Sequence, residues 1–283
     1  MNQRHLSLRR KTARRRSSSP LIYLAATAIL SGLVVATPAS ASARTSFKVE
    51  SDAGGIAIDS RGNIWVTYPT IDSIEEFSSK GARLRLLAGV NQPGGIAIAP
   101  DGNLWVTSSN GRYIEELSPK GKVLESNSLF GPYNIAVDSR GDLWVDYIEG
   151  NYVQEFSSKN LLSQLRSVSD GPETGGIAVD SRGNLWVTYP ATNSVAEFSS
   201  AGTELRSFKV GKDPDAIAVA PNGNVWIDNI LLLSVVEYTS KGVKLHSFPE
   251  DDPSVIAIDP QGNVWVANTF VDTIVEIPKT SAQ

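Results

Sequence analysis

Residues 55–66 read GIAIDSRGNIWV, and closely similar stretches return five more times along the chain. One tryptophan stands at the same place in each copy, and neighbouring tryptophans are 39 to 42 residues apart. A period of this length is typical of repeat architectures, in which each unit buries its apolar face against the next. The six tryptophans are Trp65, Trp105, Trp144, Trp186, Trp226 and Trp265.

Each unit of the repeat predicts four short strands. In the first unit, residues 55–59 form the first strand, which we place innermost because its Gly and Ala residues suit a crowded position. Residues 64–67, 73–77 and 82–88 predict the second, third and fourth strands, separated by glycine-containing turns. Four antiparallel strands in each of six units predict an all-β fold, a six-bladed β-propeller over residues 44–283.

The two ends of the repeat region predict how the ring closes. The last unit stops after its third strand, at residues 273–277. Residues 45–49 read TSFKV and match RSFKV at 206–210, which is a fourth strand in another unit. The N-terminal strand, about residues 45–50, is therefore predicted to complete the last blade and cover its open edge.

Two recurring features of the units are predicted to be structural. We expect the tryptophans to fill the space between adjacent blades; stacking on a ligand is the alternative. The Asp-Ser-Arg-Gly-Asn segments are predicted to be hairpin turns in which the aspartate oxygen accepts backbone N–H groups. They lack the alternating acidic ligands and terminal glutamate of calcium-binding loops.

The first 43 residues have the layout of a secretory signal peptide. The segment contains seven basic residues, all before residue 17, and no acidic residue. An apolar run follows at residues 21–36, and small residues end the segment. We expect cleavage after Ala43, with Ala41 as the alternative, and a secreted or extracytoplasmic protein. An uncleaved membrane anchor is the competing interpretation, but the apolar run is short for a spanning helix. The pair Arg9-Arg10 leaves the twin-arginine route open.

Composition excludes several classes of function. The chain has no cysteine, which excludes disulfides and thiolate ligands, and its two histidines are too few for a multi-histidine site in one chain. Beyond residue 43, 19 basic residues stand against 30 acidic ones. This acidic balance disfavours nucleic acid as a partner. We expect no membrane association after cleavage, and a monomer.

The phrase G-I-A-[IV]-D-x-x-G-N-[LIV]-W-V, followed by I-x-E-F-S-x-x-G, resembles the NHL repeat. It looks closest to the repeats of streptogramin (virginiamycin B) lyases and is more distantly similar to those of SMP-30/gluconolactonase propellers. The lyases use histidines, a glutamate and magnesium on a seven-bladed ring. Here the only histidine beyond residue 43 is His246, on a predicted outermost strand, so no catalytic residue is carried over. The lactonase type holds its metal with Glu, Asp and Asn, which stays possible here.

By analogy with these families, a ligand would bind at the mouth formed by the loops that join strand four to strand one and strand two to strand three. These loops are rich in acidic residues and tyrosines, whereas the opposite loops are rich in Arg and Lys. We therefore predict an acidic, aromatic mouth and a basic opposite face; solvated charged loops without function are the alternative. The predicted ligand-binding residues are Tyr68, Tyr133, Asn134, Tyr147, Tyr189 and Asp215.

Units three and five break the repeat. After Trp-Val or Trp-Ile they carry Asp146 and Asp228, where units one, two and four carry threonine. The Gly-Gly pair that opens the innermost strand is replaced by Tyr133-Asn134 and by an Asp-Ala pair at Asp215. Asp146 and Asp228, with oxygens of Asn134 and Asp215, predict a site for a divalent cation, calcium or magnesium. The alternative is that the two aspartates simply fill the channel with water.

The sequence favours a secreted, non-catalytic binding module that presents its mouth to a small molecule, a glycan or a protein. The alternative is a metal-dependent lactonase-like hydrolase or a streptogramin-lyase-like enzyme that uses carboxylates in the channel mouth. An enzyme would need carboxylates that converge on one ion. A third option, a structural part of a surface complex, would need an exposed apolar patch, and residues 230–233 are the loop segment apolar enough to form one.

Overall fold

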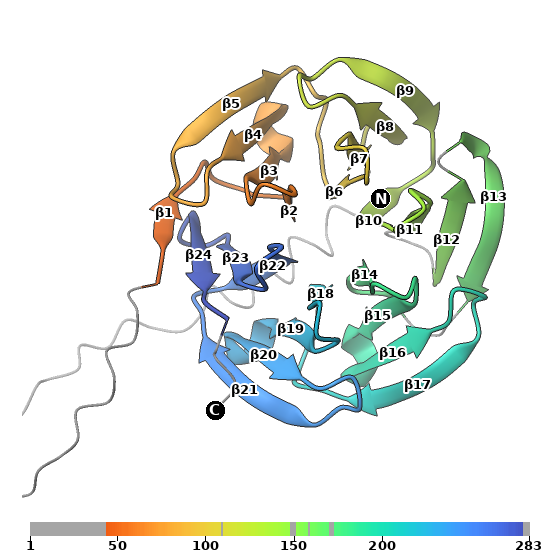
Figure 1. The fold of residues 1–283 in the computed structure, drawn as a ribbon, viewed down its shortest axis with the longest axis vertical. Helices are drawn as coiled ribbons and strands as arrows, with labels where there is room; N and C mark the ends of the chain where they lie inside the picture. Colours follow the sequence, from red (N-terminus) through yellow and green to blue (C-terminus); the bar gives the residue numbers. More distant parts are fainter. Residues whose placement is uncertain (1–43, 109, 148–150, 158, 170–172, 280–283) are drawn as a thin grey trace, which may run out of the picture. The chain divides into compact units, whose positions relative to one another are not determined.

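The computed structural model describes residues 44–108, 110–147, 151–157, 159–169 and 173–279. In this part of the chain, six four-stranded antiparallel sheets follow one another around a ring (Figure 1). Each sheet is one blade, and its innermost strand contacts the innermost strands of both neighbouring blades. The prediction of a six-bladed β-propeller is confirmed. The predicted signal peptide, residues 1–43, lies outside the described residues.

The blades are numbered in chain order, each from its innermost strand outward. Blade 1 holds β2 (Gly55–Ile58), β3 (Ile64–Tyr68), β4 (Ser73–Phe77) and β5 (Arg83–Ala88). Blade 2 holds β6 (Ile96–Ile98), β7 (Leu104–Ser108), β8 (Tyr113–Leu117) and β9 (Val123–Ser128). Blade 3 holds β10 (Pro132–Val137), β11 (Leu143–Tyr147), β12 (Tyr152–Ser157) and β13 (Asn160–Ser169).

The second half of the ring repeats this order. Blade 4 holds β14 (Ile177–Val179), β15 (Leu185–Tyr189), β16 (Ser194–Phe198) and β17 (Glu204–Lys209). Blade 5 holds β18 (Ile217–Val219), β19 (Val225–Asn229), β20 (Ser234–Tyr238) and β21 (Lys244–Pro249). Blade 6 holds β22 (Pro253–Ile258), β23 (Val264–Asn268), β24 (Thr273–Ile277) and, outermost, β1 (Ser46–Lys48).

The N-terminal strand closes the ring as predicted. β1 pairs antiparallel with β24, and Phe47 stands opposite Ile274 in the register. The Phe47 ring lies 5.4 Å from the ring of Phe77 in blade 1 and 6.3 Å from that of Trp265 in blade 6. The first strand of the propeller therefore covers the open edge of the last blade and also packs against the first.

The tryptophans form the core between blades. Trp65 of blade 1 packs with Leu104 and Val106 of blade 2, and Trp186 of blade 4 packs with Val225 and Ile227 of blade 5. All six indoles are buried. Burial of this much aromatic surface drives blade-to-blade association, which explains why every unit keeps its tryptophan.

The hairpin turns between the first two strands are built as the sequence predicts. In blade 4, Asp180 Oδ1 accepts the backbone N–H groups of Arg182 and Asn184, both at 2.9 Å. Gly183 has a φ of 81°, a value that glycine adopts without strain. The aspartates of blades 1, 3 and 6 accept the same two backbone N–H groups in their own turns.

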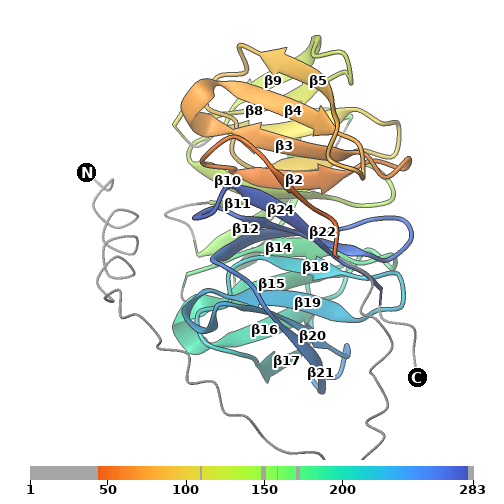
Figure 2. The ribbon, with the colours of Figure 1, turned by 90° about the vertical axis from the view of Figure 1, so that its left-hand side faces the viewer.

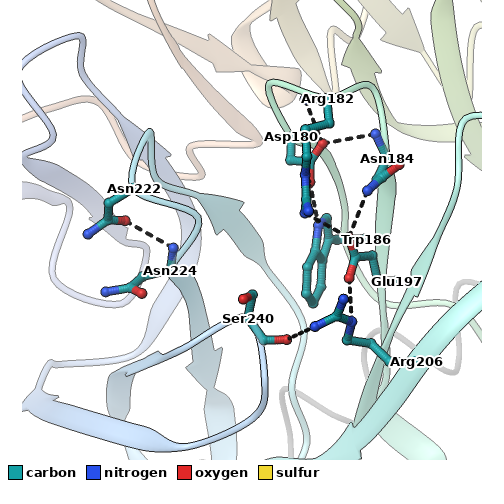
Figure 3. A network of polar contacts seen from close by, with 9 residues as sticks. All are labelled: Asp180, Arg182, Asn184, Trp186, Glu197, Arg206, Asn222, Asn224 and Ser240. Carbon is teal, nitrogen blue, oxygen red and sulfur yellow. Dashed lines mark hydrogen bonds and ion pairs between the residues drawn. The ribbon is translucent and has the colours of Figure 1, made fainter.

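In blades 1, 3 and 4, a buried glutamate on the third strand links the turn to the outer strand, and Figure 3 shows the network of blade 4. One carboxylate oxygen of Glu197 in blade 4 pairs with Arg182 at 2.8 Å and accepts a hydrogen bond from Asn184 at 2.8 Å. Its other oxygen pairs with Arg206 at 2.7 Å. Arg206 also donates to the carbonyl of Ser240 in blade 5, at 3.2 Å. The network therefore neutralises a fully buried carboxylate and ties two blades together.

In the described part of the chain, three short 3-10 turns follow the second strands of blades 1, 4 and 5: η1 (Pro69–Ile71), η2 (Pro190–Thr192) and η3 (Ile230–Leu232). Figure 2 views the ring from its edge, and the turns of blades 1 and 4, drawn in orange and teal, project from the same side. Among the described residues, no helix has the length and apolar character that crossing a membrane requires.

Candidate functional site at the channel mouth

The inner rim of one channel mouth is formed where the innermost strands begin. In blade 4, the hydroxyl of Thr188 accepts the backbone N–H of Gly176 at 2.7 Å and donates to the backbone carbonyl of Asp215, in blade 5, at 2.6 Å. Thr107 of blade 2 makes the same pair of bonds, ending on the carbonyl of Tyr133. The threonine hydroxyl therefore joins each of these blades to the next.

Glycine opens the innermost strand of these blades because the neighbouring backbone comes very close. A Cβ atom added to Gly176 would lie 2.4 Å from the carbonyl oxygen of Asp215, and one added to Gly95 would lie 2.6 Å from that of Tyr133. Neither contact is compatible with a side chain. The glycine and the threonine thus belong to one arrangement, in which the next blade's carbonyl approaches near enough to accept the hydroxyl.

Blade 3 replaces this arrangement with an aspartate and an asparagine. Asp146 accepts the backbone N–H of Asn134 on Oδ1 and the Asn134 side-chain amide on Oδ2, the latter at 2.9 Å. Both oxygens of Asp146 act as acceptors in these bonds. The Asn134 amide makes the bond to the next blade, because it also donates to the carbonyl of Gly175 in blade 4 at 2.7 Å. Asn134 therefore has a structural role that the sequence did not reveal.

Blade 5 has the aspartate but not the asparagine. Asp228 Oδ1 accepts the backbone N–H of Asp215 at 2.9 Å. Asp228 Oδ2 is buried and has no hydrogen-bond partner among the described residues. Ala216 takes the position of Asn134 here, so that position offers no side-chain amide. Among the described residues, Asp228 therefore keeps a buried carboxylate oxygen whose hydrogen-bonding capacity is unused.

Burial disfavours the ionised form of both aspartates and so raises their pKa values. Desolvation raises the pKa of Asp146 to about 7, against the lowering effect of its two bonds from Asn134. Desolvation also raises the pKa of Asp228 well above its usual range, and the negative charge of Asp215 raises it further. Asp215 acts in the same direction on Asp146. A positively charged group placed beside Asp215 would therefore relieve repulsion at both buried carboxylates.

The four predicted tyrosines differ in exposure. Tyr68, Tyr147 and Tyr189 end the second strands of blades 1, 3 and 4, and all three are buried in the core clusters of those blades. The Tyr147 hydroxyl donates to Gln154. Only Tyr133 is exposed, so it alone presents an aromatic surface to a ligand without a rearrangement. Ligand binding through the other three stays a prediction.

Three acidic side chains lie close enough together to hold a cation, and they are not those of the mouth. Oxygens of Asp138, Asp142 and Glu155 in blade 3 lie within 4.8 Å of one another, and no other such trio occurs among the described residues. Arg140 forms ion pairs with all three, at 2.7, 3.2 and 2.9 Å, and Arg166 pairs with Glu155. These guanidinium groups already supply the positive charge that a metal ion would bring.

Ion pairs between arginines and buried carboxylates also change the interpretation of the basic face opposite the mouth. Arg61, Arg140 and Arg182 each bind a turn aspartate and a buried glutamate of their own blade. A cavity of about 250 Å³ at this end is lined by Ile58, Val219 and Ile258, together with Asp59 and Asp259. Both of these aspartates are engaged in their turns. The arginines here stabilise the blades, a role that the recurrent glutamate of the third strand could have indicated.

His246 lies where the sequence predicted, on the outermost strand of blade 5. Its Nδ1 atom is 2.7 Å from Glu237 Oε2, and its side chain is half exposed on the outer surface. In the register it stands opposite Glu237, where Arg206 stands opposite Glu197 in blade 4. It therefore takes the place of a structural arginine, far along the blade from the innermost strand.

No family model and no curated protein matches the chain. Among solved structures, virginiamycin B lyase from Staphylococcus aureus is similar, with a TM-score of 0.62 and 21% identity over 78% of each chain. A gluconolactonase from Xanthomonas campestris has a TM-score of 0.68 and 16% identity, over 86% of this chain and 94% of that one. The shared feature is the propeller fold. Both resemblances suggested by the repeats are thus confirmed at the level of architecture, which alone assigns no activity.

Proposed function

We propose that this chain is a secreted, non-catalytic binding propeller that recognises a positively charged group of its ligand at the channel mouth. One observation carries the proposal. The buried Asp228 has a carboxylate oxygen without a partner among the described residues, and it lies beside Asp215, whose charge also acts on Asp146. A bound cation would satisfy the oxygen and lower the free energy of all three carboxylates.

The arrangement favours an ammonium or guanidinium group of a small molecule, glycan or protein over a chelated metal. A metal such as calcium needs several oxygens that converge at 2.3–2.6 Å, and the mouth aspartates are not among the carboxylates that cluster within 4.8 Å. An organic cation needs only one or two acceptors and tolerates longer separations. Tyr133, which precedes Asn134 in the chain, is exposed and adds an aromatic side chain to the mouth.

The test is thermal unfolding of the protein with organic cations and, in parallel, with calcium, magnesium and manganese ions. A ligand present at 100 times its dissociation constant adds about 2.7 kcal/mol if it binds only the folded state. Alkylammonium and guanidinium compounds should raise the melting temperature. A shift produced by a metal ion instead, and lost on Asp228 substitution, would support the lactonase-like or lyase-like alternative and call for a lactone screen.

The repeat supplies a matched control variant. The double substitution Ala216→Gly with Asp228→Thr gives blade 5 the residues that blade 4 carries at the same positions, Gly176 and Thr188. This variant should fold, because three blades of the same ring use the pair. It removes the buried carboxylate, so a ligand-induced shift that survives in the variant would contradict the proposal.

A further inference from the structure

The loop that follows β19 in blade 5 departs from the rules that its counterparts in blades 1 and 4 obey. The three loops have the same backbone: a 3-10 turn and then one residue in the left-handed conformation. That residue is Asp72 in blade 1 and Asn193 in blade 4, with φ of 51° in both, but Leu233 in blade 5, with φ of 48°. Asp and Asn tolerate this conformation, whereas leucine is strained in it.

Leu233 also lacks the hydrogen bond that its counterparts make. Asp72 Oδ1 accepts the backbone N–H of Gln92 at 2.8 Å, and Asn193 Oδ1 accepts that of Asp213 at 2.9 Å. A leucine side chain has no oxygen to offer. Blade 5 therefore gives up both a relaxed backbone and a loop hydrogen bond at a position where blades 1 and 4 keep them; blade 2 places Arg112, with φ of 57°, at the same position. Local strain of this kind points to a role outside folding.

The loop of blade 5 presents apolar side chains to solvent. Leu231, Leu232 and Leu233 are 68%, 53% and 51% exposed. On the next two blades around the ring, loops of the same kind present Phe270, 75% exposed, and Ile71, 53% exposed. We call these five side chains the apolar arc. Single exposed leucines are ordinary, but three in a row on a strained turn are not.

The surroundings of the arc are acidic. In blades 5, 6 and 1, the loops on this side comprise residues 49–54, 69–72, 211–215, 250–252 and 269–272, which contain nine acidic residues and one basic residue, Lys212. Arg44 pairs with Glu250 at 2.7 Å. The exposed amine of Lys48 donates to the backbone carbonyl of Val271 in the same region. A second copy of the chain would meet like charge here, as would an anionic membrane.

We propose that the apolar arc is a docking surface for a protein segment that carries apolar side chains interspersed with lysine or arginine. The apolar side chains of the segment cover Leu231, Leu232 and Leu233, and its basic residues meet the acidic loops of blades 6 and 1. This inference rests on the strained loop and its charged surroundings, and it does not depend on any ligand at the channel mouth.

The test measures binding of a synthetic peptide of alternating leucine and lysine to the whole protein by fluorescence anisotropy. The variant Ile230→Pro, Leu231→Ala, Leu232→Thr, Leu233→Asn gives blade 5 the PATN loop of blade 4. We expect at least tenfold weaker binding. The melting temperature should stay within a few degrees of the parent's, because Leu233→Asn relieves backbone strain while Ile230→Pro removes the hydrogen bond from the Ile230 backbone N–H to the Asp213 carbonyl at 3.2 Å. A cooperative thermal transition in that range shows that the variant is folded, so its loss of binding cannot be attributed to unfolding.

Two controls distinguish binding at the apolar arc from nonspecific hydrophobic binding. The double variant Leu84→Thr and Leu205→Thr removes exposed leucines from outermost strands and should leave binding unchanged. A leucine–glutamate peptide should bind at least tenfold more weakly than the leucine–lysine peptide. Equal binding of both peptides, or unchanged binding by the PATN variant, would overturn the proposal. So would self-association, or adsorption to phosphatidylcholine vesicles, that the PATN variant abolishes.

Discussion

Asp228 accepts the backbone N–H of Asp215 at 2.9 Å on one carboxylate oxygen and buries the other without a hydrogen-bond partner among the described residues. In blade 4 the corresponding side chain, Thr188, is fully satisfied, because its hydroxyl both accepts and donates. The ring therefore contains, within one repeat pattern, a complete junction and an incomplete one. Blade 3 also departs from the repeat, but Asn134 restores its bond to the next blade. The incomplete junction of blade 5 is therefore a place where an asymmetric function can arise.

Completing that junction should stabilise the fold. The variant Ala216→Gly with Asp228→Thr replaces a buried carboxylate by a hydroxyl that can donate to the next blade, as Thr188 does. We expect an increase of about 1–2 kcal/mol in the free energy of unfolding at pH 8, after the entropic effect of the added glycine. Urea unfolding measures it. A less stable variant would mean that Asp228 makes favourable contacts in the folded protein.

Stability should fall as the pH rises from about 4 to about 7. Burial raises the pKa of Asp146 to about 7, so over this range the folded protein holds a proton that the unfolded chain has already lost. The unfolded state then binds fewer protons, and rising pH favours it by a few kcal/mol in total. Asp59 and Asp180, whose pKa values are lowered, act only at lower pH.

The variant Asn134→Gly with Asp146→Thr isolates this effect. It gives blade 3 the glycine and threonine of blades 1, 2 and 4, and it removes the titrating carboxylate. Unfolding free energies of variant and parent should converge near pH 4 and diverge toward pH 8. A constant difference across that range would show that Asp146 is already ionised at acid pH.

The buried glutamate network should be among the larger single contributions of a polar side chain. Glu197→Ala leaves Arg182 and Arg206 without their common acceptor. Both arginines are partly exposed and can turn to solvent, so we expect a loss of about 2–3 kcal/mol, at the low end for a broken buried ion pair. Urea unfolding tests it, with exposed Glu204→Ala as the control, expected to change stability by less than about 0.5 kcal/mol.

Ring closure should depend on Phe47. Its ring contacts blade 1 through Phe77 and blade 6 through Trp265, so Phe47→Ala opens a gap at the seam. A loss of about 2–4 kcal/mol is expected, below the value for a fully buried phenylalanine because Phe47 is only partly buried. Ser46→Ala, on the exposed face of the same strand, is the matched control. Equal effects of the two substitutions would contradict the packing role of Phe47.

The architecture was predictable because the repeat encodes it six times. Trp65 and its five equivalents, the turn aspartates and the TSFKV match at residues 45–49 correctly predicted blade number, core, turns and closure. Strand limits differed by one or two residues: Tyr68 extends the second strand, and the N-terminal strand, predicted at about 45–50, spans Ser46–Lys48. Local sequence patterns of this kind suffice when each unit forms the same contacts as its neighbours.

The site was less predictable because it depends on contacts between units. The sequence identified Asp146, Asp228, Asn134 and Asp215 as departures from the repeat. It did not reveal that the Asn134 amide replaces the threonine hydroxyl as the hydrogen-bond donor to the next blade. Nor could it tell that Tyr68 points into the core, since a tyrosine at a strand end suits a loop surface equally well. Burial and hydrogen-bond partners become visible only once neighbouring blades are in place.

The central claim is that the buried carboxylates of the mouth bind a cationic group, and thermal unfolding of parent and Ala216→Gly, Asp228→Thr variant tests it most directly. The account predicts that organic ammonium or guanidinium compounds raise the melting temperature of the parent, more at pH 8 than at pH 5, and not that of the variant. Equal shifts in both proteins, or no shift in the parent with any cation, would contradict it.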